Sequence, residues 1–546
     1  MGHVLLNQVG FKPDDGKKAV LDFAGSDFQI KNEQGQTVYN GSVQHFGKDE
    51  ISGEDTFIAD FSDLKENGRF QLVSGDESSV FFKIGNDVYD SLMKDVCKCF
   101  YFLRCGDALS KEFAGDYYHE ACHMTKATVY GEKDAEPVDV TGGWHDAGDY
   151  GRYSTAGAVA VAHLLYGVRF FPNLLKIEFD IPKVKGDKGQ LPDILAEVKV
   201  ELDFLKKMQR KDGSVWHKVT TFCHAPFEMP QEDKEELFLF PVSSLATADI
   251  SAVFALAYSI YKDYDRAYAD GVLEASKKAY KWLSDNPDEL LFKNAEDSNT
   301  GEYDEAEDIS NRFWAAASLY EATKDKSYYE DAKALKERLL AFDRTADKKG
   351  YQGDVLTCLG WADVAGLGAL SLILMNEDDK LTEDIKNAFI LESDRLVRNA
   401  SKNGFGLCME ACDFIWGSNM ELLKYLMILA VTDKVICHKN EYRNAITSGI
   451  DYLLGCNSMD VSYVTGNGEK AFKNPHLRPT AVDGIDEPWP GLVSGGPNVG
   501  LQDERAKEVP AGSAPMKCYY DHVDCYSLNE ITIYWNSPLV FVLAYI

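Results

Sequence analysis

Residues 139–153 carry the residue types that hydrolysis of a neutral, polyhydroxylated substrate would need. Asp146 and Asp149 stand three positions apart among four glycines, which let the backbone turn sharply and approach a ligand closely. Flat apolar faces on which a sugar ring can stack come from Trp144, Tyr150 and Tyr153. The competing interpretation is a solvated turn, because Asp and Gly dominate ordinary turns. Three aromatic residues and a histidine in so short a polar stretch favour glycan hydrolysis.

This stretch resembles the signature of glycoside hydrolase family nine, the inverting cellulase family, at nearly every position. Inverting hydrolysis needs an acid that protonates the leaving oxygen and a second carboxylate that activates water, with the two roughly 6.5–9.5 Å apart. The resemblance implies that Asp149 is the general base and that Asp146 helps to hold the same water. The acid should lie elsewhere, in a drier setting that raises its pKa.

Glu530 is the candidate for the acid. It lies in an apolar stretch, residues 526–538, which we expect to open the last helix. The local sequence alone fits an ordinary first-turn glutamate, favoured by the helix dipole, equally well. The stretch resembles the catalytic-acid motif of the family, and this resemblance favours the acid.

The loop 474–479 predicts a substrate contact, because its prolines would fix a His and an Arg two positions apart. Both side chains can donate hydrogen bonds to sugar hydroxyls. The resemblance implies that His476 and Arg478 are ligands, although family members usually carry a second histidine where this chain has Leu477. Two further residues could be stacking platforms or buried core residues, namely Trp416 and Trp535.

Two thiols and two imidazoles near the first carboxylates suggest a metal site; they are Cys105, Cys122, His123 and His145. Such a set matches tetrahedral zinc, but the spacing is not that of a standard finger, and by pattern alone buried thiols are the better interpretation. A subset of family-nine enzymes has a zinc site with this arrangement, so the resemblance implies a structural zinc. Because His145 precedes Asp146, such a metal would pin the catalytic loop to the first barrel helix.

The acidic loop 303–308 raises calcium as a second metal, since family members often bind it in acidic loops before a helix. Ser310 and Asn311 stand where the family often has an Asp–Glu pair. A solvated acidic loop is therefore the preferred interpretation, with calcium kept open.

Residues 1–86 predict a β domain that precedes the catalytic residues. Turn clusters separate seven short strand candidates, at residues 4–6, 18–21, 28–30, 37–39, 56–59, 69–73 and 80–84. About seven short strands in this length suggest an immunoglobulin-like β-sandwich. Residues 7–11 resemble the start of the N-terminal module that many family-nine enzymes carry.

Residues 87–546 predict a mainly helical domain. Apolar residues recur at helical spacing in twelve segments, which begin near residues 88, 156, 192, 247, 267, 310, 327, 361, 383, 417, 439 and 528. Periodicity does not decide between a solenoid and a closed barrel, but a fixed-length repeat is not apparent, which weakens the solenoid. The resemblance implies an (α/α)6 barrel. Long loops at 105–155, 211–246, 286–309 and 456–527 would build one face of it and carry the motifs.

The formal net charge of −31 argues against nucleic acid and disfavours anionic membrane surfaces as partners. No run of about 18 apolar residues predicts a membrane span. The N-terminus lacks the pattern of a signal peptide, so we expect a cytoplasmic protein, or a secreted one whose signal has been removed. Twelve cysteines, several in apolar helical patterns, favour a reducing compartment.

The leading functional hypothesis is an inverting β-1,4-glucanase of the endo type, acting on cellulose-like chains or cello-oligosaccharides as a monomer or weak oligomer. An exo-acting relative that cleaves short cellodextrins or glucosamine oligomers is the enzyme alternative; Phe227 and residues 226–240 resemble such members, and a missing secretion signal would favour soluble oligomers. A carbohydrate-binding protein without catalysis is disfavoured because all three carboxylates are present. A zinc hydrolase is disfavoured because four protein ligands leave no open metal position.

Overall fold

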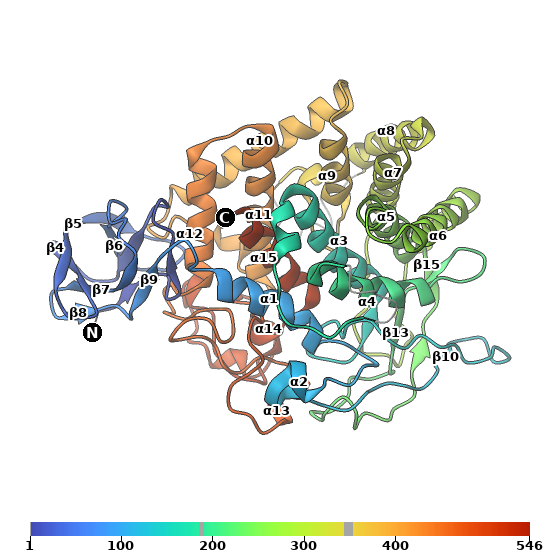
Figure 1. Cartoon of the computed structure of the whole chain (residues 1–546), viewed down its shortest axis with the longest axis horizontal. Helices are drawn as coiled ribbons and strands as arrows, with labels where there is room; N and C mark the ends of the chain where they lie inside the picture. Colours follow the sequence, from blue (N-terminus) through green and yellow to red (C-terminus); the bar gives the residue numbers. More distant parts are fainter. Residues whose placement is uncertain (1, 185–190, 343–352) are drawn as a thin grey trace.

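A computed structural model describes residues 2–184, 191–342 and 353–546. The described residues form an N-terminal β-sandwich and a larger helical domain that lie side by side (Figure 1). The boundary falls between the last strand of the sandwich, which ends at Ile84, and the first long helix, which begins at Asp90.

The sandwich contains all seven predicted strands and two further strands of two residues each, β2 and β8. The strands are β1 (Val4–Leu5), β2 (Gly10–Phe11), β3 (Lys18–Leu21), β4 (Asp27–Asn32), β5 (Thr37–Lys48), β6 (Asp55–Asp60), β7 (Gly68–Ser74), β8 (Glu77–Ser78) and β9 (Phe82–Ile84). Their order is β1-β3-β6-β5-β4-β7-β9-β2, and all pairs are antiparallel except β2 with β9. Strand β5 is much longer than predicted and pairs with both β4 and β6. Alternate residues of β4 and β7 point inward and build a separate apolar core.

In the described part of the chain twelve long helices follow, one for each predicted segment. They are α1 (Asp90–Phe102), α3 (Ser154–Phe170), α4 (Asp193–Lys207), α5 (Ser244–Tyr261), α6 (Arg266–Asp285), α7 (Ile309–Thr323), α8 (Lys326–Ala341), α9 (Ala365–Met375), α10 (Lys380–Ala400), α11 (Ser418–Val431), α12 (Asn440–Leu453) and α15 (Ile533–Tyr545). The last helix begins later than predicted, because the short helix α14 (Tyr526–Asn529) and an extended link precede it.

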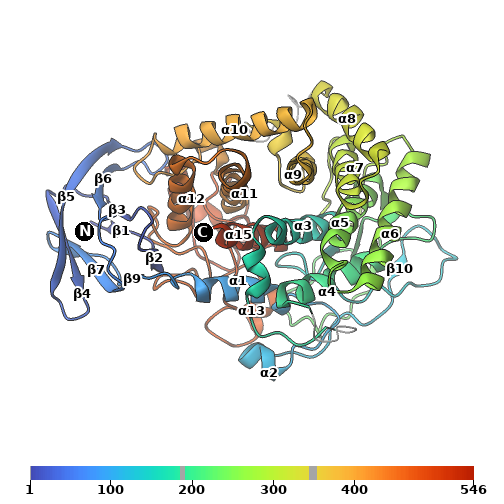
Figure 2. The same cartoon turned by 45° about the horizontal axis from the view of Figure 1, so that its top comes forward.

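Six helices form an inner ring: α3, α5, α7, α9, α11 and α15 are buried along nearly their whole length. Outer helices such as α6, α10 and α12 bury one face and expose the other (Figure 2). This arrangement confirms the (α/α)6 barrel. By length and composition α5 could cross a membrane, but 94% of it is buried inside the protein, as a core helix of the ring requires.

The sandwich is fastened to the barrel through the segment that resembles the start of the family module. The Asn7 amide donates to the buried Asp451 carboxylate of α12 over 2.9 Å. The Gln8 side chain donates to the Asp460 carbonyl and accepts from the Lys470 amide, at 3.1 and 2.8 Å. Polar contacts of this kind fix the orientation of one domain on the other and hold the start of the long loop 456–527.

A small sheet gathers the loops on the face of the barrel that carries the motifs. Its order is β10 (Thr128–Val129), β14 (Phe238–Leu239), β13 (Lys218–Thr220) and β11 (Arg152–Tyr153). Strand β11 directly follows the stretch that contains Asp146 and Asp149, so this sheet ties that stretch to the loop 221–237.

Candidate active site

The loop that carries Asp146 and Asp149 is shaped by glycines. Gly142 and Gly143 have φ of +103° and +80°, which only glycine adopts readily. At Gly148 a Cβ would lie 1.9 Å from the carbonyl oxygen of His476, so another residue would push the two segments apart. The glycines that surround the carboxylates are therefore required by the turn and by close packing against the loop 474–479.

Asp149 is buried among hydrogen-bond donors. Its Oδ2 accepts from the Gly151 amide and the Tyr153 hydroxyl, each at 3.2 Å, and lies 3.3 Å from Nδ1 of His224. Burial opposes ionisation, but the hydrogen bond and positive charge of His224, helped by Arg478, lower the pKa of Asp149 to about 2. Asp149 is thus a carboxylate at neutral pH, as a general base must be.

Asp146 is also buried, and it is held by an aromatic hydroxyl. Its Oδ2 accepts a hydrogen bond from Tyr303, whose hydroxyl also contacts that of Tyr534 over 3.2 Å. Its Oδ1 has no hydrogen-bond partner among the described residues although it is shielded from bulk solvent, so it can hold a water. Burial raises the pKa of Asp146 well above its usual range, and the charge of Asp149 adds to this effect.

Glu530 lies in the extended link between α14 and α15, two residues before Thr532, which caps α15 with its side chain. The first-turn interpretation of this glutamate is therefore wrong. The residue keeps partial solvent access, but protein surrounds its carboxyl closely. Burial, and then the negative charges of Asp149 and Asp146, raise the pKa of Glu530 to about 8. Glu530 therefore carries a proton at neutral pH.

Arg478 and His476 connect the two carboxyl-bearing segments. The Arg478 guanidinium is buried and donates to the carbonyls of Gly148 and Ala225, at 2.6 and 2.8 Å. His476 pairs with Glu530 in a β-bridge, and its Nδ1 lies 2.6 Å from the carbonyl oxygen of Val523. Two of the donor groups of Arg478 therefore hold the backbone at Gly148 and Ala225. The partly exposed ring of His476 faces the site.

The aromatic residues divide into two groups that the sequence could not separate. Trp416 is 41% exposed, its ring lies 5.2 Å from that of Tyr526, and it hydrogen-bonds to Glu530. Trp535 is only 5% exposed and packs against the backbone beneath the site. The expectation that the aromatics of residues 139–153 offer faces to a sugar is wrong, because all three are buried; they are Trp144, Tyr150 and Tyr153.

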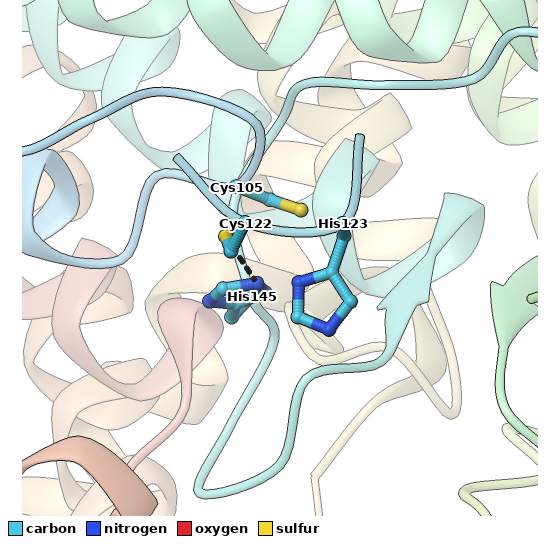
Figure 3. Close-up of side chains that lie close together, drawn as sticks. All are labelled: Cys105, Cys122, His123 and His145. Atoms are coloured by element: carbon cyan, nitrogen blue, oxygen red, sulfur yellow. Dashed lines mark hydrogen bonds between the residues drawn. The ribbon is translucent and has the colours of Figure 1, made fainter. Parts of the chain in front are cut away.

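The four candidate metal ligands converge in one buried cluster beside this loop (Figure 3). Backbone pairing of residues 103–105 with 143–145 brings Cys105 next to His145. The ligand atoms all lie within 4.8 Å of one another, and Sγ of Cys122 is 3.8 Å from Nε2 of His145. Among the described residues this is the one such group of three or more His, Cys, Asp or Glu side chains.

The donor set fits a soft, tetrahedrally coordinated metal. Nδ1 of His123 is buried without a close hydrogen bond from the described residues, although Cys105 lies near the ring, while its Nε2 lies 3.2 Å from Oδ2 of Asp233. Burial opposes ionisation of Cys105, but the hydrogen bond from Cys122 and the charge of Arg152 hold the pKa of Cys105 well below its usual value. A thiol that ionises more readily and an imidazole nitrogen turned toward it are the groups a metal would bind.

The acidic loop 303–308 differs from the expected solvated loop, because its acidic residues from 305 to 308 are buried. The Asn311 amide donates to Asp249 and Glu305 at 3.0 and 3.1 Å, so amide protons point at two carboxylates. Glu307 accepts from the first amides of α7, and Asp308 pairs with Arg312 over 2.8 Å. Each of these carboxyl groups has a donor on one oxygen, but Oδ2 of Asp249, Oε2 of Glu305 and Oδ1 of Asp308 are buried without a hydrogen-bond partner among the described residues, so calcium stays open.

Several functional contacts were not identified from the sequence. His224 and Tyr303 touch the two aspartates, and Asp233 touches the metal cluster. All three lie in the long loops that were predicted to build the site, but the contacts depend on folding of segments far apart. The left-handed backbone of Tyr303, with φ of 48°, has no signature in the sequence.

A ring of helices whose loops gather an ionised Asp149, a protonated Glu530 and a buried Asp146, with an exposed tryptophan beside them, has the features of a glycoside hydrolase. The sequence profile described as glycosyl hydrolase family 9 matches residues 89–543, and that of the cellulase N-terminal ig-like domain matches residues 1–79. The chain belongs to glycoside hydrolase family 9.

Similar proteins include enzymes named cellodextrinase and endoglucanase. A cellodextrinase from Butyrivibrio fibrisolvens is 70% identical over 100% of this chain and 99% of its own length. Endoglucanase D of Acetivibrio thermocellus is 35% identical, over 99% of this chain and 83% of its own length. The structure of a Zn-binding triple mutant of the family 9 endoglucanase J30 has a TM-score of 0.90 and 30% identity, and covers 98% of this chain and 99% of that one. This chain is accordingly an inverting glycoside hydrolase that cleaves β-1,4-glucosidic bonds in glucans.

Proposed function

We propose that Glu530 is the general acid of this glucanase and that Asp149 is the general base. The opposite pKa shifts of the two groups carry this assignment: at neutral pH Glu530 has a proton to give and Asp149 has a lone pair to accept one. Water between Asp149 and the anomeric carbon would attack as Glu530 protonates the leaving oxygen, and the anomeric configuration inverts.

Asp146 is proposed as the second holder of the attacking water. Its Oδ1 makes no hydrogen bond within the described residues, and Tyr303 fixes its other oxygen. The free Oδ1 of Asp146 can hydrogen-bond to the water while Asp149 accepts one of the protons of the water. The two aspartates therefore orient a lone pair of the water toward the sugar, which lowers the entropic cost of attack.

The substrates proposed are cello-oligosaccharides, with sugar rings stacked on Trp416 and hydrogen-bonded to His476. The 70% identical relative is named a cellodextrinase, which supports short soluble chains. Endo-action on longer glucans is the second candidate, because a 35% identical relative is named an endoglucanase.

Product analysis separates these candidates. Digestion of cellopentaose with one end isotopically labelled should release a single short product from one end throughout the time course, whereas early scission at several internal bonds would favour endo-action. Chitosan oligomers serve as the second substrate, and faster cleavage of these than of cellopentaose would contradict glucose units as the natural ones.

The metal proposed for the cluster is zinc, held by Cys105, Cys122, His123 and His145. Four protein ligands close the coordination shell and leave no position for a reacting water, so its proposed role is structural. The name of the Zn-binding family 9 mutant and the convergence of four soft ligand atoms support this choice. Such a zinc would clamp the segment after α1 to the loop that carries Asp146 and Asp149.

We further propose that the enzyme works in a reducing compartment such as the cytoplasm, on a soluble glucan and without nucleic acid or membrane partners. All twelve cysteines lie in the described residues and form no disulfide there, which supports a reducing environment. Redox state and fractionation of the native protein in cell extracts would test this.

A further inference from the structure

The loop 221–237, between β13 and β14, touches both the metal cluster and the reacting groups. One end of the loop brings His224 to Asp149, and Phe227 lies with its ring 5.4 Å from that of His476. The other end carries Asp233, which contacts His123. One short segment therefore connects the cluster to the wall of the site.

Asp233 is placed to control which nitrogen of His123 is free. The Asp233 side chain is 1% exposed, its Oδ2 lies 3.2 Å from Nε2 of His123, and its Oδ1 accepts from the Glu235 amide over 3.0 Å. A carboxylate accepts but does not donate, so it requires a proton on Nε2. In the neutral ring the lone pair then resides on Nδ1, the nitrogen that makes no close hydrogen bond within the described part of the chain and that Figure 3 shows turned toward the cluster.

We propose that Asp233 is a positioning residue of the metal site, which sets the tautomer of His123 for zinc and thereby couples the zinc to the order of the loop 221–237. The proposal rests on the zinc of the proposed function. Outer-shell carboxylates of this kind orient metal-bound imidazoles and raise metal affinity. Because binding is linked to order, zinc would stabilise the loop, and a disordered loop would weaken zinc binding.

Contacts of the loop 221–237 with Arg478 and Tyr150 connect the metal cluster to the residues that line the site. The carbonyl of Ala225 accepts from Arg478 over 2.8 Å, and the carbonyl of Glu228 accepts from the Tyr150 hydroxyl. The metal cluster thus contacts two loops that line the site. It contacts the loop of the aspartates through His145, and the loop of His224 and Phe227 through Asp233. The alternative is that Asp233 and His123 form a buried ion pair without influence on the metal.

Zinc affinity separates the positioning role from the plain ion pair. In Asp233→Asn the new amide can present an N–H to Nε2, which favours the wrong tautomer, so competition with a chelator should show zinc bound roughly 10–100-fold more weakly. Asp233→Ala should behave similarly, and the exposed Glu235→Gln is the matched control that should keep normal affinity. Circular dichroism checks that each variant folds. Wild-type affinity in a folded Asp233→Asn variant would overturn the proposal and favour the plain ion pair.

Hydrogen exchange tests the coupling on the unmodified enzyme, without dependence on any variant. Chelation of zinc should speed exchange of amides in 221–237 by at least tenfold, while those of the sandwich strand β7 stay unchanged. Unchanged exchange in 221–237 would overturn the coupling. A wild-type protein that binds no zinc would refute the metal and this proposal together, whereas tight zinc binding with normal Asp233→Asn affinity would refute this proposal alone.

Discussion

The loop around Asp149 and the link that carries Glu530 face the same site but impose opposite charge states on buried carboxyl groups. Around Asp149 two hydroxyl or amide donors and His224 converge on one oxygen, so the charged form is satisfied. Around Glu530 the main effects are burial and two negative neighbours, with Trp416 offering a hydrogen bond, so the proton is retained. Burial is common to both, and the number of donors decides the outcome.

This difference explains why one carboxyl group can act as the base and the other as the acid. Two side chains with nearly the same ordinary pKa become a base and an acid because one segment supplies donors and the other does not. The carboxylates also affect each other, since the charge of Asp149 helps to keep the proton on Glu530. The pair therefore works as a unit, and the variants below should change one side of it at a time.

The largest effect is expected from neutralising either member of the pair. Asp149→Asn and Glu530→Gln should each lower kcat on cellopentaose roughly 10²–10⁴-fold, because each removes one proton-transfer group. Thermal unfolding should stay close to that of the wild type, which shows that the fold is intact. Turnover near the wild-type rate in either folded variant would remove that residue from the assignment.

The second effect is expected from disrupting the metal cluster, which holds the loop that carries Asp149. Cys122→Ser should lose zinc, unfold at a lower temperature and turn over more slowly, because the loop of the aspartates loses its clamp. Metal analysis and calorimetry measure the first two changes. Added zinc should not speed the intact enzyme, and Cys412→Ser, at an exposed thiol, is the control. Stoichiometric zinc retained by Cys122→Ser at full stability would contradict the clamp.

The third effect is expected from ionisation of Glu530 and is measured as the pH dependence of kcat/KM. Because the acid must be protonated, kcat/KM should fall as pH rises through about 8, the pKa to which burial raises Glu530. In Glu530→Gln the side chain cannot ionise, so this alkaline limb should disappear from the residual activity. A limb that persists at the same pH in that variant would belong to another group.

The smallest effect is expected from removing one donor of Asp149. His224→Ala should raise the pKa of Asp149, because the histidine supplies the hydrogen bond and charge that lower it. The base works when ionised, so the acid limb of kcat/KM should move to higher pH, by about one unit or 1.36 kcal/mol. Replacement of His438, an exposed histidine that pairs with Asp433, should leave the limb in place. An unchanged limb in His224→Ala would mean that the histidine does not tune the base.

The sequence predicted the parts of this molecule that depend on local periodicity and on motifs. The twelve long helices of the described residues and seven of the nine strands of the sandwich follow from apolar spacing, since tertiary packing here reinforces local preference. The four cluster residues were also identified, but through the resemblance to family members with this arrangement, because the pattern alone favoured buried thiols. Their convergence within 4.8 Å confirms the cluster, although the identity of the metal rests on proposal.

The other features of the site could not be predicted, because they depend on contacts between segments that lie far apart in the sequence. Trp144 and Trp416 look alike in the sequence, yet one is 1% exposed beneath Phe100 and the other 41% exposed at the site. Asn311 was noticed as a departure from an acidic pair, but its bridge between Asp249 and Glu305 requires α5 and α7 to be adjacent. The start of α15 was misplaced because the apolar residues before it continue the helical pattern through an extended link.

The most direct test of the acid and base assignment uses a substrate whose leaving group needs no proton, such as 2,4-dinitrophenyl β-cellobioside. Glu530→Gln should cleave it within about tenfold of the wild-type rate, because acid assistance is no longer required. Asp149→Asn should remain roughly 10²-fold or more slower, because water must still be activated. If Glu530→Gln fails on this substrate as badly as on cellopentaose, or if Asp149→Asn recovers instead, the proposed roles of the two carboxyl groups are wrong.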